Sequence, residues 1–343
     1  MLVRLDLDDA RWRDFVSSAN EALPFHHPSW ASLLAECYGF RPFALALEEE
    51  GHIRAGLPVL EVRGLLGGRR WSSLPFTDHC PPLATTQAAL EQLPAALDEA
   101  RERAGAARVE LHGELSGPHA ASWPTAVTHT LGLRRDAAEL FAAFHRSQVQ
   151  RNVRKAEESR LVLRRAEREE DLTEAFYGLH LETRRRQGTP VQPRRFFRLL
   201  WRRVLEPGLG YLTLAYDGSA PAAGAVFLAW NGTVTYKYGA SDPRLLGLRP
   251  NHLIFWDAIR RACESGYRSF DFGRTDFENG GLREFKSRWG AQEVPLVYST
   301  VAGAAPAAGH GHGRSARALG TVIRRSPAWV CRGLGEALYK YAA

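Results

Sequence analysis

Asp78, His79 and Cys80 bring together the residue types of a nucleophile, a base and an acid. Three adjacent residues on one strand or loop cannot readily face one another as a catalytic triad requires. The chain also has no P-loop, no GxGxxG after a strand, no GxSxG and no HExxH. The residues that carry chemistry must therefore be sought elsewhere.

Two stretches concentrate positive charge in a chain whose formal net charge is +7. Residues 301–343 carry six Arg and Lys against one Glu, and 182–203 carry eight arginines against one Glu. Only four residues of the chain are lysine, at positions 155, 237, 286 and 340. Arginine dominance alone indicates a GC-rich genome rather than a ligand, so a lysine kept in this background, such as Lys286, is of interest.

The 343 residues are 45% hydrophobic and 24% charged, which predicts about two globular domains and excludes a disordered, collagen-like or coiled-coil chain. No apolar run reaches the roughly 18 residues of a membrane span. The first residues include acids where a signal peptide has basic and apolar ones, so we expect a cytoplasmic protein. The four cysteines are far apart without a CxxC pair, which favours free thiols over disulfides or zinc.

The first half predicts a hairpin, a loop, a helix and a strand. Helices are expected near 8–20 and 28–38, extended runs at 42–48 and 53–62, a polar loop at 73–83, a helix near 86–104 and a strand at 108–113.

The second half repeats that order. Helices are expected over 136–158, 169–186 and 194–205, and a strand starts at 161. Three strands follow, joined by turns at Asp217-Gly218 and Asn231-Gly232, which are strong hairpin signals. Helix 251–265 and strand 269–274 complete the order.

Three strands, a loop, a helix and a strand form the core order of the acyltransferase fold with a mixed, splayed sheet. The fold class expected is therefore α/β, with two tandem GNAT-like domains over 1–134 and 135–302. A small-residue linker and two short basic amphipathic helices, divided at Pro327, are expected in 303–343. These helices either cap the second domain or contact a membrane surface or RNA.

Acyl-CoA transferases of this fold hold the cofactor pyrophosphate on backbone N–H groups at a glycine-rich turn before the central helix. The equivalent turn here reads Gly247-Leu248-Arg249-Pro250-Asn251-His252. Because proline has no N–H and side chains replace the glycines, a standard CoA site is disfavoured.

Five stretches carry a family resemblance: RNVRKAEES (151–159), HLETRRRQGTPVQPRRFF (180–197), YKYGASDPRLLGLRPNHLIFWDAI (236–259), YRSFDFGRTDFENGGLREFKSRWG (267–290) and the closing GEALYKY. They resemble the Fem (FemABX-like) family of the GNAT superfamily, non-ribosomal peptidyltransferases that use aminoacyl-tRNA. The first half matches more loosely through WASLLAECYGF and SLPFTDHCPPL. The resemblance implies two acyltransferase-like domains and transfer from the 3′-terminal ester of a charged tRNA to an amine.

The resemblance also implies site residues. The family places a Phe-Lys pair of a GLxxFKxxxG context near the reacting ester, and Phe285 and Lys286 match it. A fixed ammonium stabilises the oxyanion that amine attack creates, so Lys286 is the expected catalytic residue and Phe285 is expected to stack on the terminal adenine. The alternative is a surface lysine. Arg249, Asn251 and Arg274 are the further donor-binding candidates, although Asn251 also suits a helix N-cap and Arg274 an ion pair with Asp276.

Anionic acceptors in the family are held by an arginine from a region like 184–195, where bidentate guanidinium contacts suit phosphate. Alternation on a strand predicts both tyrosines of Tyr236-Lys237-Tyr238 on one face, where they orient the acceptor amine or pack in the core. The acceptor-binding candidates are Arg184, Gln192, Arg194, Arg195, Tyr236, Tyr238 and Asp276.

The function expected is amide formation from an aminoacyl group on tRNA and an amine acceptor, in cell-wall precursor or natural-product biosynthesis. No metal or tightly bound cofactor is expected, because the donor ester is already activated. One alternative is an acyl-CoA-dependent N-acyltransferase, with acyl-CoA as co-substrate. The other is a non-catalytic protein that binds RNA or the inner membrane through its basic tail.

Overall fold

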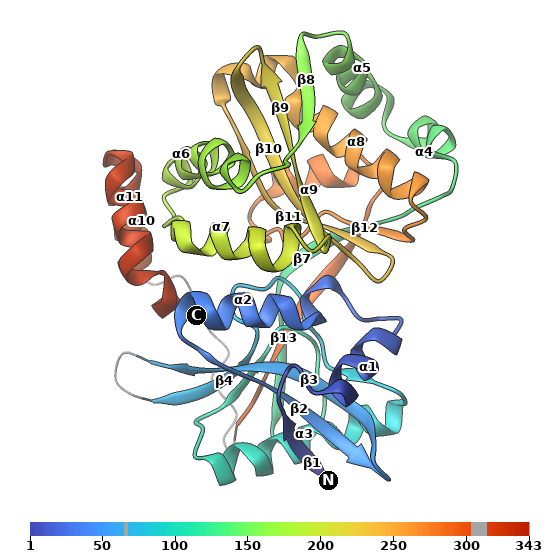
Figure 1. Cartoon of the computed structure of the whole chain (residues 1–343), viewed down its shortest axis with the longest axis vertical. Helices are drawn as coiled ribbons and strands as arrows, with labels where there is room; N and C mark the ends of the chain where they lie inside the picture. Colours follow the sequence, from blue (N-terminus) through green and yellow to red (C-terminus); the bar gives the residue numbers. More distant parts are fainter. Residues whose placement is uncertain (65–67, 303–313, 343) are drawn as a thin grey trace. The chain divides into compact units, whose positions relative to one another are not determined.

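The computed structural model describes residues 1–64, 68–302 and 314–342 (Figure 1). The first unit is Met1–Val127 with the described residues of 295–309 and 340–343, and the second is Thr128–Val294 with those of 310–339. These units differ from the expected domains 1–134 and 135–302 because β7 (Ala120–Gly132) and β13 (Gln292–Val301) each contribute to both. The expected linker at 303–313 lies outside the described residues.

The first unit contains a mixed sheet in the order β1-β2-β3-β4-β6-β13, with β5 beside β3. Its strands are β1 (Leu2–Leu5), β2 (Arg41–Glu49), β3 (His52–Arg63), β4 (Arg69–Ser73), β5 (Leu83–Ala84) and β6 (Val109–Leu111). Its helices are α1 (Ala10–Ser18), α2 (Pro28–Tyr38) and α3 (Gln87–Ala104), with a 3-10 turn η1 (Pro24–His26). The strands β4 and β6, which flank α3 in the chain, pair in parallel.

Alternating residues of β3 contact helices on the two faces of this sheet. Leu57 lies in a buried cluster with Leu93 and Leu97 of α3. Its neighbour Gly56 faces the other way, where a Cβ would come within 2.9 Å of the Trp12 ring of α1. The strand period of two therefore divides the core of the first unit into two layers.

The second unit contains the sheet order β7-β12-β11-β10-β9-β8. Its further strands are β8 (Leu161–Arg165), β9 (Gly210–Asp217), β10 (Ala220–Trp230), β11 (Thr233–Ser241) and β12 (Ser269–Asp271). Its helices are α4 (Ala137–Ala143), α5 (Arg151–Glu157), α6 (Tyr177–Gln187), α7 (Arg194–Leu200), α8 (Pro250–Glu264), α9 (Gly280–Ser287), α10 (Arg314–Arg325) and α11 (Ala328–Leu338). Helical turns η2 (Arg146–Gln150), η3 (Asp171–Phe176), η4 (Trp201–Leu205), η5 (Pro243–Leu248) and η6 (Tyr339–Ala342) connect or extend them.

The same element order occurs in both units, as the sequence predicts. Three antiparallel strands, a helix and a parallel strand appear as β2-β3-β4, α3 and β6, and again as β9-β10-β11, α8 and β12. The hairpin turn at Asn231-Gly232 has φ of 48° and 75°, the left-handed pair that a primed turn requires. The expected α/β fold with tandem GNAT-like units is confirmed.

Several segments differ from the sequence-based expectation, including β1 and β4, which were not predicted. The helix expected over 136–158 is interrupted, because Phe144 is extended and the His145 side chain accepts the Gln148 N–H to start a new turn. Strands β7 and β13 were not predicted, and each contains a proline, Pro124 or Pro295. Proline weakens a strand signal because it cannot donate to the ladder.

The two faces of the second sheet carry different helices (Figure 1). On one face, α8 packs an aromatic core of Phe227, Phe255, Phe270 and Trp289, all buried. On the other face lie α6 and α7, whose His180 and Phe197 contact β11 through Tyr238. The sheet therefore separates two aromatic clusters.

The C-terminal helices divide at Pro327, as predicted, and they pack on α6 of the second unit. Gly335 of α11 approaches the chain so closely that a Cβ there would lie 1.9 Å from the Val191 carbonyl oxygen. Arg185 donates from Nη1 to the Ser326 carbonyl at 3.3 Å, and Glu336 accepts the Arg194 N–H at 3.0 Å. The described part of the tail therefore caps the second unit.

All four cysteines are free thiols, and Cys80, Cys263 and Cys331 are buried. Within the described ranges, no helix has the length and apolar character needed to cross a bilayer.

Docking of α11 makes a prediction about two neighbouring glycines. Gly335→Ala places a methyl group against the Val191 carbonyl, so we expect α11 to loosen at a cost of about 1–3 kcal/mol. Gly333→Ala is the matched control, since a methyl group there would have no atom within 4 Å and alanine favours helix. Limited proteolysis of the tail measures the difference. Equal cleavage of the two variants would contradict this packing.

Two buried histidines make stability depend on pH. Burial lowers the pKa of His26 to about 4 and that of His180 to about 3. The unfolded chain therefore binds protons at these histidines near pH 6.5, whereas the folded chain does not. The two histidines leave the free energy of unfolding undiminished above that pH and lower it below that pH. Between pH 6.5 and 5 we expect each histidine to cost up to about 1.4 kcal/mol per pH unit.

Urea unfolding at several pH values checks this slope. His180→Asn keeps a donor for Gln192, whose Oε1 lies 2.9 Å from His180 Nε2, and it removes one titrating imidazole from the second unit. The slope of that unit is expected to decrease. The slope of the first unit, which retains His26, is expected to stay unchanged in this variant. A slope that His180→Asn fails to reduce would show that other groups dominate.

Candidate active site

The parallel strands β11 and β12 part early. Their pairing runs only from Thr233–Ser269 to Thr235–Asp271, although β11 continues to Ser241. Beyond Thr235 the backbone groups on that edge of β11 have no strand partner in β12. We call this parting, with the chain that follows each strand, the β11–β12 fork. The site residues of the second unit are described from it.

A bulge in β11 places its two tyrosines on opposite faces of the sheet. Phe227 of β10 pairs with Tyr236 and the next residue, Val226, pairs with Tyr238, which leaves Lys237 as the extra residue. The Tyr236 ring lies 4.9 Å from Phe255 of α8, whereas the Tyr238 ring lies 5.7 Å from His180 of α6. The prediction that both tyrosines share one face is wrong, because the bulge adds one residue to the alternation.

Tyr236 depends on a glycine for its place. A Cβ on Gly239 would lie 1.7 Å from the Tyr236 hydroxyl, so only glycine leaves room for that phenol. Burial raises the pKa of Tyr236 to about 12, and the phenol therefore stays protonated at neutral pH. Gly239 was not predicted to matter, since its role depends on a neighbour that folds back onto it.

Lys286 of α9 lies beneath the chain that leaves β12. The residue is 1% exposed, and its ammonium donates to the carbonyl oxygens of Gly273 at 2.6 Å and Arg274 at 3.3 Å. A buried charge is tolerated only where hydrogen bonds replace its hydration. The surface-lysine reading is therefore excluded, and the ammonium is a fixed positive charge at the base of the fork.

Polar groups behind Lys286 hold the same segment. Asp271 accepts from Thr128 Oγ1 at 2.5 Å and from the Gly273 N–H at 2.8 Å. The fully buried His129 lies 3.3 Å from a Glu293 oxygen, and burial followed by the charge of Lys286 lowers the pKa of that imidazole. These neighbours, none of them predicted, keep the lysine surroundings rigid.

Phe285 belongs to an aromatic group beside the fork. Its ring is half-buried and meets His252 edge-on at 5.3 Å, while His252 stacks on Trp289 at 5.9 Å. Burial lowers the pKa of His252 to about 4, so the imidazole is neutral at physiological pH. Part of the Phe285 ring is thus buried against His252. The exposed part of the ring is accessible to a donor.

The start of α8 offers few backbone donors. The Arg249 N–H bonds to the Leu246 carbonyl at 3.0 Å, and Pro250 at the first helical position has no N–H. Arg249 is itself the N-cap, with φ of 63°, so the reading of Asn251 as N-cap is wrong. The Arg249 Nε is buried and makes no hydrogen bond within the described ranges. Arg249 and Pro250 therefore stand at the turn where glycine N–H groups hold phosphate in CoA sites.

Most of the predicted acceptor residues of 184–195 hold the protein together. Arg184 donates to the Pro190 carbonyl, and Gln192 is buried against His180. Arg194 lies over the Tyr177 ring at 5.1 Å. Arg195 is exposed on α7. These residues lie around α6 and α7, on the sheet face opposite Tyr236, so the acceptor candidates do not converge on one place.

Arg274 and Asp276 pair with each other, as the alternative reading expected. The Arg274 guanidinium lies 2.9 Å from the Asp276 carboxylate in the segment after β12, and Asp276 is exposed. Both lie near Lys286, which bonds the Arg274 carbonyl. The fork thus gathers Lys286, Arg274 and Asp276 from the predicted set.

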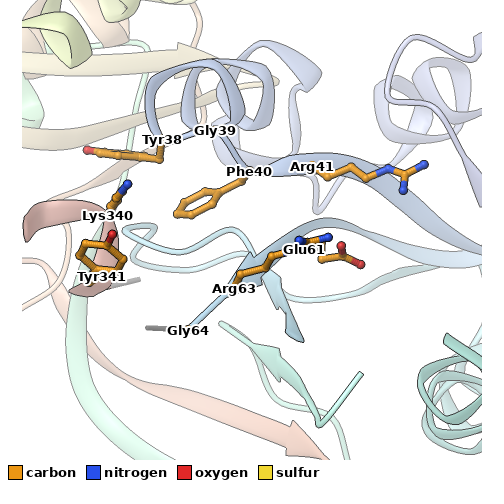
Figure 2. A pocket seen from close by; sticks show the side chains of 9 residues that line it. All are labelled: Tyr38, Gly39, Phe40, Arg41, Glu61, Arg63, Gly64, Lys340 and Tyr341. Carbon is orange, nitrogen blue, oxygen red and sulfur yellow. The ribbon is translucent and has the colours of Figure 1, made fainter. Parts of the chain in front are cut away.

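A separate cavity of about 510 Å³ opens in the first unit, at the end of α2 and along β2 and β3 (Figure 2). Its side chains include three aromatic rings, three cations and one carboxylate, from Tyr38, Phe40, Tyr341, Arg41, Arg63, Lys340 and Glu61. In Figure 2 the rings of Tyr38 and Tyr341 lie beside Lys340. None of these residues was predicted as a site residue, and the transfer chemistry is argued from the second unit.

Residues 143–287 match the family model described as "Acetyltransferase (GNAT) domain". The matched segment is a GNAT-like domain. It spans α5 to α9 and includes every element of the fork. No curated protein matches the sequence.

The fold of the described chain is also similar to that of several solved structures. It is similar to FemX, with TM-score 0.70 and 16% identity over 87% of this chain and 96% of that one. It is similar to L-PGS from Bacillus licheniformis, with TM-score 0.55 and 10% identity over 94% and 99%. A tandem GNAT protein from the clavulanic acid biosynthesis pathway gives TM-score 0.51 and 13% identity over 89% and 99%. The expected FemABX-like resemblance is confirmed in fold, and together with the GNAT domain it supports an acyltransferase.

Arg249 allows binding to be separated from folding. Glycine adopts φ of 63° without strain, so Arg249→Gly is expected to relieve about 1 kcal/mol of backbone strain. The melting temperature should therefore stay unchanged or rise. If the guanidinium holds donor phosphate, the same change weakens donor binding roughly tenfold. Thermal melts and filter binding measure the two effects. Arg249→Lys, which keeps the charge, should retain most of the affinity, and unchanged binding by the glycine variant would remove Arg249 from the site.

Proposed function

We propose that the protein transfers an aminoacyl group from a charged tRNA to an amine acceptor, at the β11–β12 fork of the GNAT domain. The observation that carries the donor assignment is the start of α8, where the Arg249 N–H is bonded internally and Pro250 has none. A CoA pyrophosphate relies on such N–H groups, whereas a guanidinium also suits the phosphates of an RNA end. The fold likeness to FemX agrees with this donor class.

The reaction requires no cofactor redox step. The acceptor nitrogen attacks the ester carbonyl carbon, a C–N bond forms, and the carbonyl oxygen becomes an oxyanion. The C–O bond to the ribose then breaks, the ribose oxygen takes up a proton and the nitrogen loses one. The products are an amide and an uncharged tRNA.

Lys286 is proposed to stabilise the oxyanion. Its ammonium is held at the base of the fork by two carbonyls, so its position is fixed before the ester binds. Because the side chain is 1% exposed, the bound ester must displace at least one of those carbonyl contacts to meet it. The 3.3 Å contact to the Arg274 carbonyl is the longer of the two and is the one proposed to be exchanged.

The other predicted residues receive proposed roles around that charge. Phe285 offers the exposed part of its ring to the terminal adenine, and Arg249 with Asn251 faces the donor phosphates. Tyr236, a protonated phenol, orients the acceptor amine. The acceptor is proposed to be an amine-bearing small molecule or cell-wall precursor, met in the cytoplasm where tRNA is charged.

Filter binding with three ligands tests the donor. Purified protein is incubated with a mixed pool of charged tRNAs, with uncharged tRNA and with radiolabelled acetyl-CoA. Retention of a charged species above its hydrolysed form is expected, with a steep loss as salt rises, because each phosphate contact releases counterions. Retention of acetyl-CoA alone would support the acyl-CoA alternative instead. Retention of both tRNA forms equally, without ester turnover, would indicate a binding protein.

Ester turnover tests Lys286. With the retained charged tRNA and a pool of amines, Lys286→Met is expected to lower amide formation about 10²–10³-fold while tRNA retention is unchanged. The matched control is Lys155→Met, at an exposed lysine of α5. Circular dichroism of the Lys286 variant must show a folded protein. A folded Lys286→Met protein with normal turnover would restrict Lys286 to holding the fork.

A further inference from the structure

The outward side of the C-terminal helices mixes apolar and basic side chains. Val322 of α10 is 53% exposed and Trp329 of α11 is 67% exposed. Arg325 and Arg332, each three residues after one of them, are also exposed. Residues three apart lie on the same side of a helix, so each helix presents one apolar and one basic side chain together. We call these four residues the tail face.

The opposite side of the same helices is already occupied. Ile323, Cys331 and Gly335 are buried, and the Cys331 thiol lies 3.5 Å from the Thr189 carbonyl. Both helices contact α6 along this side. Packing against the second unit therefore accounts for the buried residues of the tail and leaves the tail face unexplained.

The charge around the tail face has one sign. Residues 314–342 hold six of the chain's cations and a single acid, Glu336, which accepts the Arg194 N–H. Within the described ranges, neither Arg325 nor Arg332 forms an ion pair with a carboxylate. Exposed Arg195 lies on α7 beside this contact, so the positive surface continues past the tail. Such a surface attracts an anionic partner.

The exposed apolar side chains decide which anionic partner fits. An RNA backbone uses cations and can stack on an indole, but it offers no partner for an exposed valine. The interface of a bilayer accepts an indole at headgroup depth, an aliphatic side chain just below it and arginines against lipid phosphates. The combination of Val322 and Trp329 with Arg325 and Arg332 therefore fits anionic lipid better than RNA.

We propose that the tail face docks the protein on the surface of an anionic phospholipid bilayer. Trp329 and Val322 enter the headgroup region, and Arg325 and Arg332 contact lipid phosphates. The docking is reversible and peripheral, since two apolar side chains bury little area. It is independent of the donor used at the fork.

Vesicle sedimentation of the full chain tests the docking. The probes are vesicles of phosphatidylcholine alone and vesicles with one third phosphatidylglycerol. Binding to the anionic vesicles only is expected, and it should weaken as salt rises. Each arginine near an anionic surface is worth about fivefold in binding. Arg325→Glu with Arg332→Glu should therefore lower the partition coefficient at least about 25-fold.

Apolar insertion is tested by a matched pair of valines. Val322→Glu removes an insertion residue from the tail face, and Val162→Glu changes a valine of similar exposure (51%) on β8. Only the first change, together with Trp329→Ala, should reduce vesicle binding, with circular dichroism and donor retention unchanged. Equal effects of the two glutamates, or vesicle binding that survives Trp329→Ala and Val322→Glu, would overturn the proposal. So would binding of an RNA duplex through the same four residues without any vesicle binding.

Discussion

The arrangement of the fork depends on one buried ammonium. Removing Lys286 from water carries a cost of several kcal/mol, which only fixed hydrogen-bond acceptors offset. The carbonyls of Gly273 and Arg274 supply them, so the chain after β12 cannot relax without exposing or orphaning that charge. Because the lysine lies on α9, the same contact fixes this helix, and with it the position of Phe285 against α8. The parting of β11 from β12 is therefore maintained by charge as well as by strand register.

Element order was enough to predict the fold, because the decisive signals are local. The turn at Asn231-Gly232, the strand periodicity and the helix before β12 are each encoded within a few residues. The side of the sheet that a residue faces was less predictable. A single bulge at Lys237 reverses the alternation, and it arises from pairing with β10 rather than from the residues around it.

The site itself was predicted only in part, for a related reason. Lys286, Arg274 and Asp276 gather at the fork, since they lie close together in the chain. Two arginines around α6 looked free to bind a ligand because their partners lie in the C-terminal tail. Arg185 bonds a carbonyl of residue 326, and the Arg194 N–H bonds Glu336. No local pattern shows that a tail more than a hundred residues away will occupy those groups.

The identity of the buried cation also carries information. The chain uses arginine almost everywhere that it places a positive charge, yet a lysine stands at the base of the fork. A guanidinium is planar and wide, and its donors point outward in fixed directions within that plane. An ammonium is compact and directs three donors from one atom. Two carbonyls of adjacent residues, at 2.6 and 3.3 Å from one nitrogen, fit the second shape in a site that is 1% exposed. A single-atom charge can also exchange one carbonyl for a developing oxyanion without moving, which a guanidinium spread over three nitrogens cannot do in the same space.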